Sequence, residues 1–177
     1  MEIEPTSIQG VDIVRLVHHT DERGSFTEDY RAEWAGTFVQ SNLSRSRAGV
    51  LRGMHFHRRQ YDYWCYGSGR ALVNLYDLRS GSPTEDSRVT IEMDATDTPS
   101  HGIVIPPGVA HGFYAITDVV MHYMVSIYHD GSDEFGFLWQ DIGGWDLALE
   151  GGEKVVLSER DRTAPPLSWV ERPEYPR

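Results

Sequence analysis

The sequence predicts an all-β fold, a double-sheet sandwich or jelly roll, and three observations support this prediction. Apolar residues occur in short runs bounded by glycine, proline, serine or aspartate, a punctuation typical of strands and turns. In the run RALVNLYDL (70–78), Ala71, Val73 and Leu75 form one apolar face, as in a strand that lines a barrel interior. Helical patterns are scarce, and many short strands at this spacing are typical of jelly rolls.

The same signals place each element along the chain. We expect strands within VDIVRLV (11–17), GVLRGMHF (49–56), RALVNLYDL (70–78) and VVMHYMVSIY (119–128). Segments rich in glycine, proline and serine predict turns at 67–70, 79–86 and 105–112. Short helices are expected at 27–36 and in part of 153–162. No repeat or linker interrupts the pattern, so residues 1–177 are expected to form a single domain.

The composition excludes several classes of protein. The 27 acidic residues outnumber the 16 basic ones, and a net charge of −11 repels nucleic acid, so local arginines must bind any phosphate-bearing ligand. No apolar run approaches the roughly 20 residues that cross a bilayer, and the acidic start MEIEPTSIQG does not resemble a secretory signal. We therefore expect a soluble cytoplasmic protein. The single cysteine, Cys65, excludes an internal disulfide and is expected to be a small buried residue.

Four segments carry residues suited to chemistry. The first is RGMHFH (52–57), which holds His55 and His57, and the second is IPPGVAHGF (105–113), which holds His111. The third is the predicted strand with Tyr123 and Tyr128, and the fourth is LSERD (157–161) near the C-terminus. Two histidine-bearing segments on separate strands are expected to converge in one site.

Together and in this order, the segments resemble the dTDP-4-dehydrorhamnose 3,5-epimerase family of nucleotide-sugar epimerases. That family shows an RGLHF-type motif, an IPxGFAHGF-type motif, a tyrosine on the next strand and a late S-x-[KR]-D. The likeness extends to residues 21–28, 38–46 and 76–84. The resemblance implies a cupin-type jelly-roll barrel, a double-stranded β-helix with a few short helices.

The resemblance further implies an epimerase that acts, without a cofactor, on a nucleotide-linked 4-keto-6-deoxy sugar. In that reading His55 is the general base, Asp161 is its hydrogen-bonded partner and Tyr123 is the opposing acid. The chemistry requires such an arrangement, because inversion at a carbon next to a ketone removes a proton from one face and returns it to the other.

The substrate-binding residues implied by the resemblance come from both halves of a dimer. Arg23 and Arg52 would hold the diphosphate, and Tyr128 would stack on the nucleobase. Segment 23–28 comes from the neighbouring subunit in the family, which implies a homodimer. The remaining residues that the resemblance assigns to the substrate are Phe26, Glu28, Gln40, Asn42, His111 and Arg160.

One position departs from the family. Its members carry a lysine seven residues before the glycine aligned with Gly69, where the ammonium stabilises the developing enolate; here that position is Asp62. The only lysine in the chain, Lys154, lies far along the sequence. A carboxylate at this position would oppose an enolate, unless Asp62 is paired with Arg58 or Arg59.

A second departure is His57, where the family has a residue that cannot bind a metal. The spacings His55-x-His57-x4-Asp62-x6-Gly69 and Pro106-x-Gly108-x2-His111 match the pattern of metal-binding cupins, with aspartate in place of glutamate. One alternative is therefore a metal-dependent enzyme in which His55, His57, Asp62 and His111 bind a divalent transition metal. In an intermediate reading, a cation held by Asp62, His57 and His111 replaces the lost ammonium.

A third reading is a catalytically silent homologue that binds a nucleotide sugar. The remaining histidines have neither a motif nor a spacing that suggests chemistry, and we expect them to be surface or strand residues without function: His18, His19, His101, His122 and His129.

Overall fold

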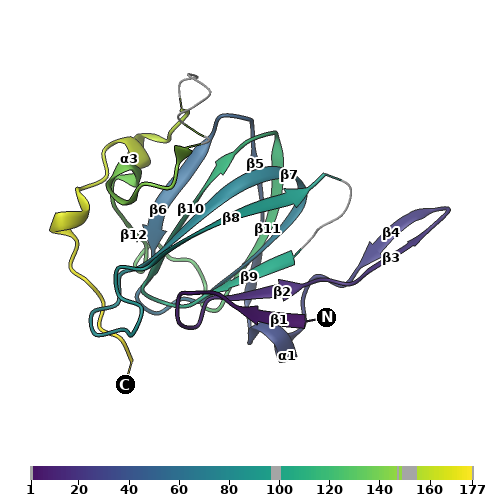
Figure 1. The fold of residues 1–177 in the computed structure, drawn as a ribbon, viewed down its shortest axis with the longest axis horizontal. Helices are drawn as coiled ribbons and strands as arrows, with labels where there is room; N and C mark the ends of the chain where they lie inside the picture. The colour runs from purple at the N-terminus through teal and green to yellow at the C-terminus, as the bar shows by residue number, and fades with distance from the viewer. Residues whose placement is uncertain (1, 97–100, 147, 149–154, 177) are drawn as a thin grey trace.

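A computed structural model of the chain describes residues 2–96, 101–146, 148 and 155–176, and in it two β-sheets face each other (Figure 1). This arrangement confirms the predicted all-β jelly roll. The first sheet has the order β1 (Glu2–Pro5), β2 (Asp12–Arg15), β9 (His101–Ile105), the first part of β7 (Asp62–Asp77), β11 (Val119–Val125) and β5 (Gln40–Ser46). The second has the order β8 (Arg88–Ala95), the rest of β7, β10 (Val109–Ala115), β6 (Leu51–Phe56) and β12 (Phe135–Gly136).

Strand β7 is long because it belongs to both sheets. Its first residues pair with β9 and β11, and its residues from Gly69 onward pair with β8 and β10. Gly69 lies at the corner with φ of +87°, and a Cβ there would sit 2.1 Å from the carbonyl oxygen of Asp118, so only glycine fits. The predicted turn at 67–70 is therefore wrong: these residues bend a continuous strand, because glycine marks bulges and sharp bends as well as turns.

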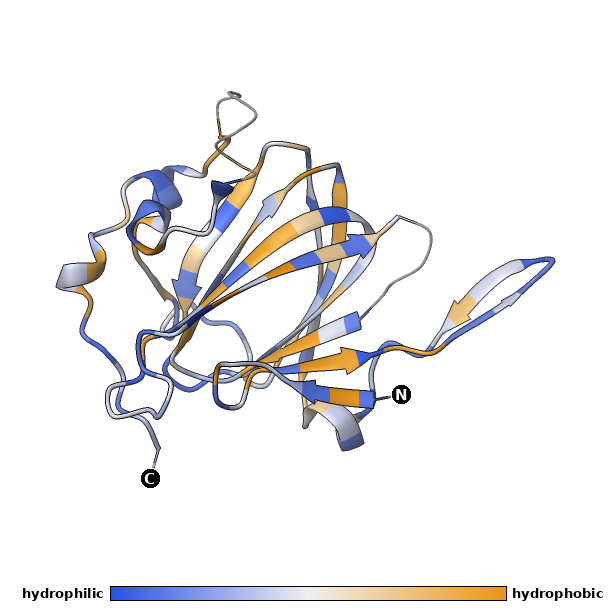
Figure 2. Cartoon of the chain, viewed as in Figure 1, coloured by the Kyte–Doolittle hydropathy of each residue, from blue (hydrophilic) through white to orange (hydrophobic). Residues whose placement is uncertain are grey.

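The main core fills the space between the two sheets. The predicted apolar face of Ala71, Val73 and Leu75 lies in it, which confirms the alternation read from the sequence, and Trp64 and Phe113 pack there from the two sides. Figure 2 shows hydrophobic residues alternating with polar ones along these strands. Full burial of side chains of this size contributes roughly 1.5–3 kcal/mol each, so the facing sheets are held mainly by this layer.

The outer faces of both sheets are also covered. The C-terminal segment places Trp139 and Trp145 against the outside of the second sheet, where the indole of Trp145 donates a hydrogen bond to the carbonyl of Trp139. Helix α1 (Ala32–Ala35) and its flanking residues cover the first sheet, where they pack in one cluster with Cys65 of β7. Cys65 is buried as predicted, and burial raises the pKa of its thiol to about 12.

The remaining predictions are confirmed in part. The predicted strands at 11–17, 49–56 and 119–128 contain β2, β6 and β11, and the turn at 79–86 separates β7 from β8. The turn predicted at 105–112 is shorter, because β10 begins at Val109. The helices expected at 27–36 and within 153–162 are reduced to α1 and α3 (Glu159–Arg162); residues 153 and 154 lie outside the described part of the chain. Two 3-10 helices, η1 (Trp139–Ile142) and η2 (Leu167–Trp169), complete the C-terminal segment.

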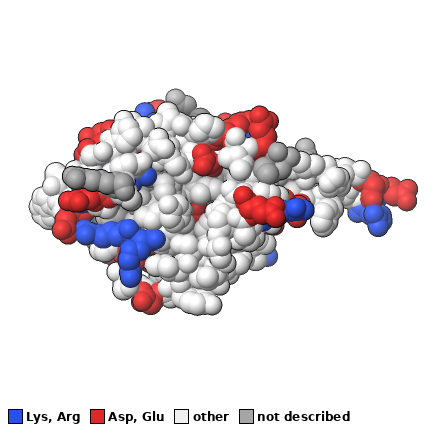
Figure 3. Space-filling model, turned by 90° about the horizontal axis from the view of Figure 1, so that it is seen from below, with Lys and Arg blue, Asp and Glu red and all other residues white. Residues whose placement is uncertain are grey.

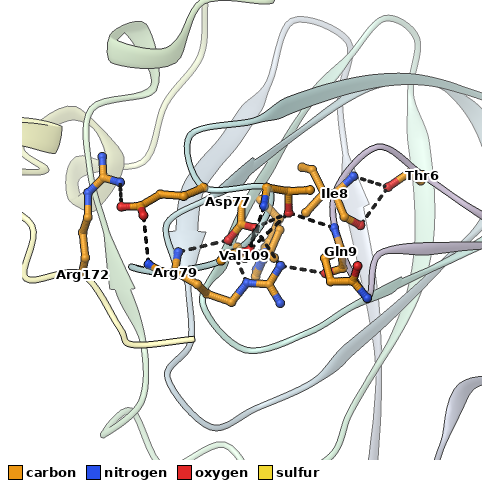
Figure 4. A network of polar contacts seen from close by, with 12 residues as sticks. Thr6, Ile8, Gln9, Asp77, Arg79, Val109 and Arg172 are labelled. Carbon is orange, nitrogen blue, oxygen red and sulfur yellow. Dashed lines mark hydrogen bonds and ion pairs between the residues drawn. The ribbon is translucent and has the colours of Figure 1, made fainter. Parts of the chain in front are cut away.

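A buried polar network joins the N-terminal segment to the loop after β7 (Figure 4). Asp77 accepts hydrogen bonds from the guanidinium of Arg79 at 2.7 and 2.8 Å and from the hydroxyls of Ser82 and Thr84. Arg79 also donates to the carbonyl of Gln9, so the pair ties residues far apart in the sequence. Such a buried ion pair is tolerated because its remaining polar atoms have partners.

The hairpin formed by β3 (His18–Asp21) and β4 (Gly24–Thr27) projects away from the two sheets (Figure 1). Its phenyl group, Phe26, is 68% exposed. Figure 3 shows acidic and basic side chains together at the end of this projection, where Asp21 and Arg23 form an ion pair. Among the described residues, no helix has the length and apolar character needed to cross a membrane.

Candidate active site

A cavity of about 340 Å³ lies between the two sheets, and side chains from five strands line it. Gln40, Asn42 and Ser44 alternate along β5, and Met121, Tyr123 and Val125 alternate along the neighbouring β11. The period of two follows from strand geometry, since every second side chain points to the same face of a sheet. Strands β6, β7 and β10 supply the remaining strand residues of the wall, which are Arg52, His55, Asp62, Trp64, His111 and Phe113.

His55 and Asp161 form a close polar pair in the cavity wall. Nε2 of His55 lies 2.6 Å from a carboxylate oxygen of Asp161, which belongs to the short helix α3. The hydroxyl of Ser158 caps that helix by accepting a hydrogen bond from the Asp161 amide at 3.1 Å. Burial by itself raises the pKa of Asp161, but the hydrogen bonds from His55 and Ser158 outweigh it and hold that pKa below its ordinary value. Asp161 is therefore an anion that accepts the Nε2–H of His55.

The position of His55 depends on a close approach between β6 and β10. A Cβ on Gly53 would lie 2.7 Å from the Cα of Gly112, so glycine at position 53 allows the two backbones to approach. The strand register then sets His111 opposite His55, with an irregularity just beyond. The two histidine motifs converge as the sequence predicts.

Tyr123 lies in the wall formed by the other sheet. Its partners in the strand register are Asn42 on β5 and Trp64 on β7, and all three side chains line the cavity. The pKa of the Tyr123 phenol is raised, mainly by burial and also by the nearby carboxylates of Asp62 and Glu134. A protonated phenol and the His55–Asp161 pair thus line one cavity from two facing sheets.

Three buried residues of the same cavity form a compact cluster of metal-ligand type. His57, Asp62 and His111 each offer one ligand atom, and these atoms lie within 4.8 Å of one another. His55, the fourth residue of the predicted metal set, is not part of this cluster. Three of the four predicted ligands therefore lie together.

Asp62 is not paired with the arginines that follow His57. Arg58 binds Glu171 at 2.8 Å, and Nε of Arg59 lies 3.9 Å from Asp133. The side-chain amide of Gln60 approaches Asp62 only at 3.3–3.4 Å. Burial raises the pKa of Asp62 to about 6, against the opposing effect of His57. The pKa of His111 is well below its ordinary value, mainly because the ring is buried and also because His57 and His55 lie nearby. His111 is therefore neutral.

Most of the substrate-binding residues expected from the sequence line the cavity. They are Gln40, Asn42, Arg52, His111 and Arg160. Arg52 donates to the hydroxyl of Ser46 at 2.9 Å, and Arg160 forms an ion pair with Glu134.

The other expected residues lie outside this cavity. Arg23 and Phe26 are on the projecting hairpin, and Glu28 follows it and binds Arg31. Tyr128 is 73% exposed and is not among the residues that line the cavity, so it lies beyond the wall in this chain.

Sequence reasoning missed several residues of the wall. His129 was expected to have no function, but it lines the cavity, and its Nε2 lies 3.7 Å from Glu134. Neither residue sits in a regular strand, so no periodicity could have identified them. Ser44 could have been found, because it continues the alternation of Gln40 and Asn42.

The chain as a whole resembles one family. A family model described as dTDP-4-dehydrorhamnose 3,5-epimerase matches residues 5–168. The chain is 34% identical over 190 residues to the dTDP-4-dehydrorhamnose 3,5-epimerase of Streptomyces griseus, with 98% of the chain and 92% of the relative covered.

Solved structures give the same result. The dTDP-6-deoxy-D-glucose-3,5-epimerase of Legionella pneumophila Philadelphia 1, in complex with dTDP-4-keto-L-rhamnose, matches with a TM-score of 0.89 and 30% identity over 99% of each chain. A 3'-monoepimerase from Streptomyces bikiniensis, in complex with dTDP-quinovose, matches with a TM-score of 0.82 and 28% identity over 93% of this chain and 87% of that one.

Proposed function

The chain belongs to the dTDP-4-dehydrorhamnose 3,5-epimerase family, and we propose that it inverts carbon C3, carbon C5 or both in a nucleotide-linked 4-keto-6-deoxy sugar. The observation that carries the proposal is the placement of the His55–Asp161 pair and the Tyr123 phenol in the walls of one cavity, on opposite sheets. An acid–base mechanism of inversion needs two such groups, one for each face of the sugar.

His55 acts as the base through its other ring nitrogen. Because the Asp161 carboxylate accepts the Nε2–H, the neutral imidazole carries its lone pair on Nδ1. Nδ1 removes the proton from the carbon next to the ketone, and the electrons move into the enolate. Asp161 then stabilises the imidazolium that forms, as a carboxylate does for a histidine base in other enzymes.

Tyr123 returns a proton to the opposite face. Its raised pKa keeps the phenol protonated until the enolate carbon accepts the proton. Loss of that proton leaves a phenolate beside the buried Asp62, so this site must supply a positive charge to compensate.

Arginines that line the cavity bind the diphosphate. The chain carries a net charge of −11, so a dianionic group binds only where local cations overcome the field of the whole protein. Arg52, on β6, is best suited to this role, because no ion pair is seen for it among the described residues, whereas Arg160 is already paired with Glu134. Gln40 and Asn42 supply amide groups for the sugar or the base.

The complete binding site includes a second copy of the chain. Arg23, Phe26 and Glu28 lie on or beside a hairpin that projects from its own subunit, where their side chains are exposed or intermediate in exposure. We assign them to the partner subunit's cavity in a homodimer. An exposed phenyl group on a projecting hairpin is what such an exchange requires.

The nucleotide is inferred from the relatives. The solved relatives named above bind dTDP-sugars, and they include both a 3,5-epimerase and a 3'-monoepimerase. We therefore take a dTDP-linked 4-keto-6-deoxyhexose as the substrate class.

Isotope exchange tests the proposal. The protein is incubated with dTDP-4-keto-6-deoxyglucose in heavy water, and deuterium at C3 and C5 is followed by NMR. We expect exchange at one carbon or both, its loss in His55→Ala, and no change in His122→Ala, which removes an exposed histidine from β11. A wild-type protein that binds the nucleotide sugar but exchanges neither carbon would show a silent homologue instead.

A further inference from the structure

We propose that His57, Asp62 and His111 bind a divalent transition-metal ion in the wall of the cavity. The three residues come from the segment after β6, from β7 and from β10, so both sheets contribute ligands. Two imidazoles and one carboxylate are a donor set for zinc, iron, manganese, cobalt or nickel. Three protein ligands leave coordination positions open to a substrate, as in catalytic metal sites.

The spacing of the ligand atoms suits a metal. Three atoms that lie within 4.8 Å of one another have a common point within about 2.8 Å of each. Zinc–nitrogen and zinc–oxygen bonds are about 2.0–2.2 Å long. Each ligand therefore needs to move by less than about 1 Å, which a rotation of the side chain supplies.

Both imidazoles are already oriented for binding. Nδ1 of His57 donates to the carbonyl of Asp133, and Nδ1 of His111 donates to the carbonyl of Val109 at 3.1 Å. A carbonyl can only accept, so in each neutral ring the lone pair is on Nε2. Backbone carbonyls hold metal-binding histidines in this way in many proteins.

The contact between His57 and Asp62 points to a missing positive charge. Nε2 of His57 and a carboxylate oxygen of Asp62 lie 3.5 Å apart, and both carry lone pairs. Among the residues that the structure describes, the ion pairs of Asp62 include no arginine or lysine. A buried carboxylate without a counter-charge is costly. A proton could join two of these atoms, but the third donor, His111, favours a metal because a proton bridges only two.

The metal has a role that rests on the proposed function. The sequence resemblance aligns Asp62 with a lysine of the family, and the bound cation would supply the positive charge that this lysine provides there. Bound to the ketone oxygen of the sugar, it acts as a Lewis acid that stabilises the enolate. His55 is not part of the ligand cluster, so the base and the metal can act in the same cavity.

Metal titration without substrate tests the site. Protein purified without a histidine tag is stripped with a chelator and titrated with Co²⁺, whose visible absorption reports coordination, and melting is followed in parallel. We expect equimolar binding and a rise in melting temperature in the wild type and in His122→Ala. Both signals should be lost in Asp62→Asn and His57→Gln, which nearly keep the side-chain volume and whose folding is checked by circular dichroism.

The metal-binding results can be distinguished from the results that test the epimerase proposal. A wild type without cobalt absorption or thermal shift, or binding that survives both ligand variants, would overturn the metal site. If metal binds and its removal slows deuterium exchange by about 100-fold or more, the enolate role is supported. Equal exchange in stripped and loaded protein would overturn that role. If metal binds and no exchange occurs at all, the site stands and the epimerase proposal fails.

Discussion

The imidazole of His55 and the carboxylate of Asp161 are 106 residues apart in the sequence and meet at 2.6 Å in the wall of the cavity. The contact joins β6 to α3, a helix of one turn whose position depends on the Ser158 cap. A substitution in α3 can therefore directly affect the position and charge of the proposed base, His55.

Replacement of Asp161 tests this link. Asp161→Asn keeps the shape of the side chain but cannot stabilise an imidazolium, and its amide can donate to the ring and select the wrong tautomer. We expect kcat to fall by about 10³- to 10⁴-fold with a small change in KM, as measured in steady-state kinetics. Glu159→Gln is the matched control, because it changes an exposed residue of the same helix that is not among the cavity-lining residues, and it should leave kcat unchanged. Near-normal turnover in Asp161→Asn would show that His55 works without this partner.

The buried pair of Asp77 and Arg79 carries a prediction about stability. Asp77→Asn leaves the Arg79 guanidinium buried without its counter-charge, and we expect a loss of about 3–5 kcal/mol in the free energy of unfolding by urea. Arg172→Ala breaks the more exposed ion pairs with Glu85 and Asp86 and should cost about 1 kcal/mol or less. If both variants lost the same free energy of unfolding, the buried pair would be no more important for stability than the exposed ion pairs, which would contradict this prediction.

The same pair predicts a pH dependence. Burial alone raises the pKa of Asp77, but hydrogen bonds from Arg79, Thr84 and Ser82 outweigh it, and the folded pKa lies below the ordinary value. The unfolded chain therefore binds the proton first, so this contribution is complete above about pH 4 and is lost as the pH falls through the folded pKa. Urea unfolding across this range should show a steeper acid-side loss in the wild type than in Asp77→Asn. If the two proteins lost stability equally as the pH falls, the assigned contribution of the Asp77 carboxylate would be contradicted.

A lysine in place of Asp62 separates the effect of charge from that of the metal. Asp62→Lys supplies an ammonium at the cavity wall and removes a proposed ligand. We expect this variant to lose Co²⁺ absorption and to exchange deuterium at a rate that a chelator does not change. The measurement is the exchange rate with and without chelator in wild type and variant. Loss of exchange in a folded Asp62→Lys protein would contradict the proposed equivalence of the two cations.

The projecting hairpin predicts a dimer with shared sites. Phe26→Glu places a charge on the exposed phenyl position, and we expect the molar mass by light scattering to shift toward the monomer and KM to rise. Glu22→Gln, on the same hairpin, is a control that removes a charge from the connecting turn. If the wild-type protein is monomeric at the concentrations used in the activity assay, the assignment of these residues to a shared site is wrong.

The strands and their facing residues could be predicted because side-chain alternation is local. Ala71, Val73 and Leu75 identify a core face without knowledge of the partner strand. The two histidine motifs and Tyr123 were likewise assigned to one site before the structure, through the family resemblance.

Other features depend on contacts that local pattern does not encode. The bend at Gly69 has the composition of a turn, and only the neighbouring Asp118 backbone shows that the strand continues. Glu134 and His129 reach the cavity from an irregular segment. The absence of His55 from the metal cluster depends on where the fold places the ligand atoms, which the spacing of the histidines in the sequence cannot reveal.

The claim that His55 and Tyr123 serve opposite faces of one sugar is tested most directly by Tyr123→Phe in heavy water. If only the acid is lost, His55 still removes the proton and returns a deuteron to the same face. We predict deuterium in recovered substrate of unchanged configuration, with inversion lost, while His55→Ala shows neither exchange nor inversion. Normal inversion by Tyr123→Phe would contradict the account.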